Sequence, residues 1–248
     1  MIEKNRLNKF KPLSDNQELI NKWLDLTIEN GVLVDTIQIN ENENYNIFEL
    51  KENFFGLRVI TNNKEEKIAS YPIFDEATPT EVVLKGIGEL ENTVESIRVV
   101  QKDPAVINSF ALDHLVYKQH LPDILGTKIQ ISFMGWLLSL ERQFNPPQVK
   151  QPNGKLVTTK GSSIFYNIKD KPLYEYIYQF NVESINSIIW NNYIEIIQIK
   201  TTFFKTNESK VNINLYVTER SLQNEYYPKK GEDIMGIMLL NSSISNLQ

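Results

Sequence analysis

The chain has 248 residues, which is enough for one large or two small domains, and its formal net charge is -5. Its apolar fraction of 41% and charged fraction of 23% exclude a disordered chain. The negative balance disfavours nonspecific binding to nucleic acid or to an anionic membrane. Because there is no cysteine, a thiolate nucleophile and a cysteine-ligated metal are excluded as well.

The beginning of the chain and its longest apolar stretch bear on location. Residues 1–6 are mostly polar, so we expect no secretory signal. The stretch Ile131–Leu140 is about half as long as a bilayer span requires. These features predict a cytoplasmic protein without membrane contact. The wealth of Asn, Ile and Lys indicates an AT-rich genome, bacterial or phage.

The first element in the chain is a helix predicted over Asp15–Asn30. Ser14 and Gln17 predict a capping box at its start. Asn30-Gly31 predicts an end in the left-handed conformation. The expected apolar face consists of Leu19, Ile20, Trp23, Leu24 and Ile28.

Three strands are predicted after the helix, at Val32–Ile39, Phe54–Thr61 and Lys67–Phe74. The polar segment Asn40–Asn46 is predicted to be a loop, and Asp75–Thr80 is predicted to be a boundary. Residues 1–78 are therefore expected to form a small α+β unit.

Beyond this unit the pattern is almost entirely β, which predicts an α+β, mostly β fold. A first β module is expected over residues 79–144 and a second over residues 164–248. Residues 145–163 connect them, and Asn153-Gly154 is a pair that favours a tight hairpin turn. This connection is predicted to be a protruding hairpin or a loop.

The two β modules share an order of elements. Strands are predicted at Val82–Leu90, Thr93–Gln101, Ala105–Leu112 and Thr127–Ser139 in the first, with a turn at Lys102–Pro104 and a helical run at Asp113–His120. In the second module, strands are predicted at Tyr174–Ile185, Tyr193–Phe204, Lys210–Val217 and Asp233–Asn241. A turn is predicted at Thr206–Ser209, and the segment Glu219–Glu225 leads toward the last strand. Phe110 corresponds to Leu215, Leu112 to Val217, Gly126 to Gly231 and Ile129 to Ile234. A duplication, or two β-meanders of similar length, explains this correspondence.

Three strands, a short helix, a glycine-bearing turn and a bent strand follow one another in each module. This order resembles that of the five-stranded oligonucleotide/oligosaccharide-binding barrel. The segment Tyr227–Leu240, with its Pro228, Gly231 and Gly236, also resembles the closing strand of several uncharacterised bacterial domains, although it has Gly-Glu-Asp where they have Gly-Asp. It departs from their pattern in lacking a tryptophan and a final glycine, and the resemblance implies no activity.

No catalytic motif is evident in the sequence. His114 and His120 are six residues apart, so they do not form the i, i+4 pair of a helical zinc site. Lys85-Gly86-Ile87-Gly88 lacks the third glycine of a phosphate-binding loop. We therefore predict no catalytic residue, no metal and no cofactor, although a triad assembled across the fold stays open.

The second module combines aromatic and basic residues. The candidate binding face consists of Trp190, Tyr193, Lys200, Phe204, Lys205 and Tyr216. Aromatic rings beside lysines are how many proteins bind single-stranded nucleic acid. Alternation places Phe203 and Phe204 on opposite faces of a strand, however, so one of them must belong to the core, and core packing is the favoured explanation of the aromatic content.

These observations favour a non-catalytic binding or accessory protein of bacterial or phage origin that contacts another protein. Two alternatives remain: a barrel-like module that binds single-stranded nucleic acid or a small ligand, and an enzyme with dispersed active-site residues. The sequence makes no prediction about the oligomeric state.

Overall fold

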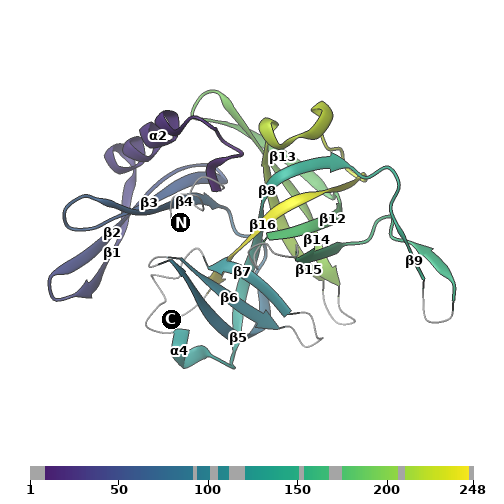
Figure 1. Ribbon diagram of the computed structural model, residues 1–248, viewed down its shortest axis with the longest axis horizontal. Coiled ribbons are helices and arrows are strands. Elements are labelled where there is room, and N and C mark those ends of the chain that lie inside the picture. The colour runs from purple at the N-terminus through teal and green to yellow at the C-terminus, as the bar shows by residue number, and fades with distance from the viewer. Residues whose placement is uncertain are drawn as a thin grey trace.

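The computed structural model describes residues 9–91, 94–100, 106–111, 121–150, 154–167, 175–205 and 210–245 (Figure 1). It confirms an α+β, mostly β fold. An N-terminal α+β unit lies against a large twisted sheet that contains most of the remaining strands (Figure 1). No helix among the described residues combines the length and the apolar character needed to cross a membrane.

Helix α2 spans Gln17–Asn30, close to its predicted range. Its predicted capping box is wrong. Asn16 is the N-cap residue, and its side-chain oxygen accepts a hydrogen bond of 3.2 Å from the backbone N–H of Leu19. Ser14 instead accepts from the backbone N–H of Asn16 at 2.9 Å. The cap lies two residues later because Asn16, not Ser14, directly precedes the first helical turn.

The end of α2 also differs from its prediction. Gly31 has an extended backbone with φ of -76°, not the left-handed conformation expected there. Its role is to permit close packing, because a Cβ at this position would lie 2.2 Å from the carbonyl oxygen of Thr27 and 2.7 Å from that of Glu49. The helix therefore ends where the chain passes tightly against the neighbouring strand.

The N-terminal sheet is a series of antiparallel hairpins in the order β1-β2-β3-β4. Its strands are β1 (Val32–Asn40), β2 (Glu43–Glu52), β3 (Phe55–Thr61) and β4 (Lys67–Phe74). The loop predicted over Asn40–Asn46 is wrong, because the turn is short and β2 already begins at Glu43. Tyr45 and Ile47, which alternate with polar residues, are buried in the core of this unit.

The large sheet has the order β11-β12-β16-β7-β6-β5-β8-β15-β14-β13, with an additional pairing of β16 with β8. Its strands are β5 (Thr80–Glu91), β6 (Val94–Val100), β7 (Val106–Ala111), β8 (Lys128–Arg142), β11 (Ile164–Asn167), β12 (Glu175–Asn181), β13 (Ser184–Trp190), β14 (Ile194–Lys205), β15 (Lys210–Thr218) and β16 (Asp233–Ser245). The strand predicted over Tyr174–Ile185 is divided into β12 and β13. Short helices accompany these strands, namely α4 (Leu121–Ile124) before β8, and two 3-10 turns at Glu219–Ser221 and Gln223–Glu225. The segments 102–104, 113–120 and 206–209 lie outside the described residues.

The two longest strands, β8 and β16, connect the halves of this sheet. They pair with each other antiparallel from Gln130 opposite Ser245 to Arg142 opposite Ile234. Strand β8 also pairs in parallel with β15, and β16 pairs in parallel with β7. The pairings therefore close one ring through β5, β6, β7, β16 and β8. A second ring runs through β12, β16, β8, β15, β14 and β13, and the chain itself completes it where β12 leads into β13.

The two halves also use the same turn before their final strands. The N–H of Gly126 donates to the carbonyl of Leu84 at 2.7 Å, and that of Gly231 donates to the carbonyl of Val182 at 2.8 Å. Both glycines have positive φ, 83° and 85°. The correspondence of Gly126 with Gly231 is thus a structural one.

Two hydrophobic cores stabilise the molecule. The inner core fills the rings and includes Leu84, Phe133, Phe180, Phe203 and Leu215. The outer core joins α2 and the N-terminal sheet to residues on the other side of the large sheet, namely Met134, Trp136, Trp190, Ile196, Tyr216 and Leu239. The N-terminal unit therefore covers one face of the second ring.

Candidate functional site

The hairpin between the two β modules is separate from both larger sheets. Strands β9 (Gln148–Lys150) and β10 (Leu156–Thr158) pair antiparallel, with Val149 opposite Val157. They form the predicted hairpin, which projects from one end of the molecule (Figure 1). Gly154 has a φ of 81°, a conformation that glycine adopts without steric cost.

The base of the hairpin is anchored to the large sheet. The buried Thr159 donates from its backbone N–H and from its hydroxyl to the carbonyl of Pro147, at 3.0 and 2.9 Å. The Gln179 side chain donates to the carbonyl of Thr159 at 2.9 Å, and the N–H of Gly161 donates to the Asp233 carboxylate at 2.9 Å. These bonds fix the base of the hairpin relative to β12 and β16.

The projecting part of the hairpin exposes apolar side chains. The exposed fraction is 54% for Val149, 60% for Leu156 and 37% for Val157. Phe144, just before the hairpin, is 73% exposed and lies 4.9 Å from the Arg142 guanidinium. A two-stranded hairpin without a core of its own is only marginally stable in water. An anchored arm with exposed apolar residues is therefore suited to burial against a partner.

The predicted binding face does not form one surface. Trp190 and Tyr216 are buried in the outer core, under the N-terminal unit. Phe204 packs against the inner core, which lies on the opposite side of the sheet. Tyr193 is 58% exposed, and its hydroxyl accepts a hydrogen bond of 2.9 Å from Trp23.

The two lysines of that predicted face, Lys200 and Lys205, are both exposed. Lys200 lines a cavity of about 230 Å³ together with Asn212, Asn214 and the linker residues Glu76–Thr78. The side-chain oxygen of Asn212 is buried and has no hydrogen-bond partner among the described residues. Glu183 lines it as well, so this cavity offers an ammonium group, carboxylates and amides to a small polar molecule.

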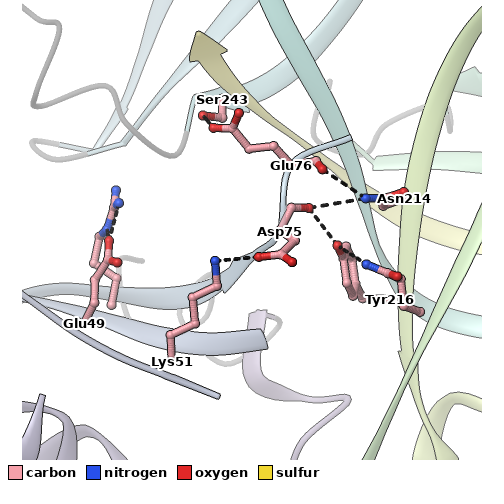
Figure 2. A network of polar contacts seen from close by, with 9 residues as sticks. Glu49, Lys51, Asp75, Glu76, Asn214, Tyr216 and Ser243 are labelled. Carbon is pink, nitrogen blue, oxygen red and sulfur yellow. Dashed lines mark hydrogen bonds and ion pairs between the residues drawn. The ribbon is translucent and has the colours of Figure 1, made fainter. Parts of the chain in front are cut away.

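A polar network attaches the linker between the N-terminal unit and β5 to the second ring (Figure 2). The Tyr216 hydroxyl donates to the carbonyl of Asp75 at 2.7 Å and accepts from Gln198 at 3.0 Å. The Asn214 amide donates to the carbonyl of Glu76 at 3.2 Å. Lys51 forms an ion pair of 2.6 Å with the Asp75 carboxylate. These contacts are those of a structural junction, in which charges and donors find partners within the chain.

Two buried tyrosines, one in this junction and one in the inner core, make the stability of the protein depend on pH. Burial raises the pKa of Tyr216 and raises that of Tyr178 well above the usual value of 10.0. Nearby Asp75 raises the pKa of Tyr216 further, whereas hydrogen bonds from Gln198 and Asn214 lower it. Because the folded state favours the protonated phenols, their contribution to stability is fully present below pH 10 and is lost as the pH rises through the raised pKa values.

We therefore expect the free energy of unfolding to fall above about pH 10. Replacing Tyr216 with phenylalanine should make that fall less steep, because one shifted phenol is removed. Urea unfolding at a series of alkaline pH values, with tyrosinate absorbance followed in parallel, measures both effects. Tyr166→Phe, at an exposed tyrosine of β11, is the matched control for the loss of a phenol hydroxyl. Equal slopes for wild type and Tyr216→Phe would contradict the prediction.

Neither a metal centre nor a known relative identifies the site. Within the described parts of the chain, no three His, Asp or Glu side chains gather in a way that could hold a metal ion. His114 and His120 lie outside these parts.

Comparisons with protein-family models, curated proteins and solved structures found no match. The Thr159 and Asp233 anchors of the hairpin were missed by sequence reasoning, since no local pattern links two residues so distant along the chain.

Proposed function

We propose that the chain is a non-catalytic binding or accessory protein that contacts another protein through the β9–β10 hairpin. The observation that supports this function is the exposure of Val149, Leu156 and Val157 on an arm with an anchored base. Interfaces gain most of their affinity from a few such side chains that become buried on binding. Because hydrogen bonds already hold the base of the hairpin in place, binding a partner costs little conformational entropy at the base.

The N-terminal unit covers one face of the second ring, and this supports protein binding over nucleic-acid binding. Rings of strands such as these, in which β8 and β16 each serve both rings, are also the frame of barrel-like modules that bind oligonucleotides. In the second ring, however, Trp190 and Tyr216 are buried under the N-terminal unit and offer no surface for stacking. The net charge of -5 also disfavours a polyanion.

A second candidate function is the binding of a small polar ligand in the cavity beside Lys200. The buried, unpartnered oxygen of Asn212 favours it, because buried polar atoms ordinarily have a hydrogen-bond partner. Such a ligand would have to supply a hydrogen-bond donor to Asn212. This function and protein binding use different surfaces, so one experiment can separate them.

The test is a tagged pull-down from the source organism with matched serine variants. Wild type is expected to capture a stoichiometric protein and no nucleic acid, whereas Leu156→Ser should weaken binding by about tenfold or more. Ile189→Ser is the control, because Ile189 has nearly the same exposed fraction, 57%, but lies on β13. Thermal melting verifies that each variant folds.

Three results would contradict protein binding through the hairpin. The first is equal capture by Leu156→Ser and wild type. The second is salt-releasable nucleic acid in place of protein, which would favour the barrel-like alternative. The third is a protein that captures no other chain and is also monomeric, which would direct attention to the Lys200 cavity.

A further inference from the structure

A second exposed apolar strand lies at the other end of the molecule. Among the described residues, β1 pairs with β2 alone and leaves its outer edge free. The exposed fraction is 67% for Val32, 51% for Leu33 and 47% for Val34. An open strand edge carries free backbone N–H and C=O groups, and exposed apolar residues on it favour pairing with another strand.

The two apolar surfaces have opposite charge. Residues 29–48, which include β1 and the first half of β2, contain the acidic residues Glu29, Asp35, Glu41 and Glu43 and no lysine or arginine. Residues 145–163, which include β9 and β10, contain Lys150, Lys155 and Lys160 and no acidic residue. The β1 edge and the hairpin are therefore complementary both in charge and in apolar character.

These surfaces cannot meet within one molecule. Figure 1 has the longest axis of the molecule horizontal, and it places β1 and β9 at opposite ends. The anchor at Thr159 and Asp233 holds the base of the hairpin at its own end. A second copy of the chain, in contrast, can present its β1 edge to the hairpin.

We propose that the partner of the hairpin is a second copy of this chain, with the β9–β10 hairpin of one copy docked on the β1 edge of the next. This inference rests on the proposed function and names its partner. Backbone hydrogen bonds extend the N-terminal sheet of one copy with a strand of the other. The valines and leucines of both surfaces become buried, and the lysines face the acidic residues. Because the contact joins two different surfaces, it generates a head-to-tail ring or chain.

Sedimentation velocity over a range of protein concentrations and salt concentrations tests this contact. Wild type is expected to associate as its concentration rises, and more strongly at low salt, since the contact joins opposite charges. The double variant Lys150→Glu/Lys160→Glu should weaken association by at least about tenfold, because it places like charges against each other. The variant Glu41→Lys/Glu43→Lys should have the same effect from the other surface.

Combining the four substitutions provides a rescue that a merely structural effect would not show. Both surfaces then carry reversed charge and are complementary again, so association should return toward that of wild type. Lys200→Glu/Lys205→Glu is the matched control, because it reverses two exposed lysines on β14, away from the hairpin. It should associate as wild type does.

The possible failures separate this inference from the proposed function. A monomer at every concentration overturns the inference, as does association that neither double variant changes. If wild type stays monomeric but Leu156→Ser loses a different captured protein, the hairpin is a binding site and its partner is not a second copy. If association occurs and depends on the charges of the two surfaces, the inference is supported.

Discussion

Replacing Trp136 with alanine is expected to lower the free energy of unfolding by about 3–5 kcal/mol. Trp136 lies on β8 and is 1% exposed. Its ring lies 5.7 Å from that of Phe55 and 5.4 Å from that of Phe74, so it is a direct contact between the large sheet and the N-terminal unit. Its indole N–H donates to the carbonyl of Lys9 at 2.7 Å, and the substitution removes that bond too.

The outer core makes this effect large. Phe55 contacts both Trp136 and Trp190, and Phe74 stacks on Tyr216 with centroids 4.6 Å apart. The cavity left by Trp136 is therefore enclosed by rings from several strands, which cannot all move to fill it.

Urea unfolding followed by circular dichroism measures the change for Trp136→Ala, since the fluorescence itself depends on the tryptophans. Ile189→Ala, at a site 57% exposed, is the control and should change the free energy of unfolding by less than about 0.5 kcal/mol. A loss below about 1 kcal/mol for Trp136→Ala would show that the N-terminal unit is not held to the sheet in this way.

Local patterns were sufficient to predict most of the individual elements. The spacing of Ile20, Trp23 and Leu24 predicts α2, and all three side chains are buried. The apolar runs of β3 and β4 predict these strands within one residue. By contrast, β2 was missed because its first residues are mostly polar, and only Tyr45 and Ile47 face the core.

The partners of the strands could not be predicted, because they depend on contacts between distant parts of the chain. Strand alternation shows that a side chain lies on one face of a sheet, but it does not show what covers that face. Trp190 and Tyr216 were candidates for a binding face for this reason. The N-terminal unit, which precedes them by more than a hundred residues, buries both.

The candidate site was predictable to the extent that it depends on local turn chemistry. Asn153-Gly154 predicts the hairpin, and β9 and β10 form it. Its exposed valines and leucine could not be distinguished from core residues in the sequence, since a strand of three residues shows no periodicity. The same holds for β1, whose apolar residues read as those of an ordinary strand but lie at a free edge.

Replacing Gly236 with alanine is expected to destabilise the protein by about 3 kcal/mol or more. Gly236 lies on β16, where it pairs with Leu140 of β8 on one side and with Tyr178 of β12 on the other. A Cβ there would lie 2.0 Å from the carbonyl oxygen of Ser139. That atom belongs to the backbone of β8 and also accepts a hydrogen bond from the Tyr178 hydroxyl, so it cannot move independently.

The matched control for this prediction is Gly126→Ala. Gly126 also has a positive φ, 83°, but a Cβ there would have nothing within 4 Å. The control therefore carries only the cost of the backbone conformation, about 1–2 kcal/mol. The difference between the two variants, measured by urea unfolding, isolates the contact between β16 and β8. Since both rings close through these two strands, a clear excess for Gly236→Ala means that their close approach limits the stability of the whole sheet. If both variants lowered the free energy of unfolding equally, the backbone of β8 at Ser139 would be able to move away, and the rings would tolerate a wider separation of the two strands.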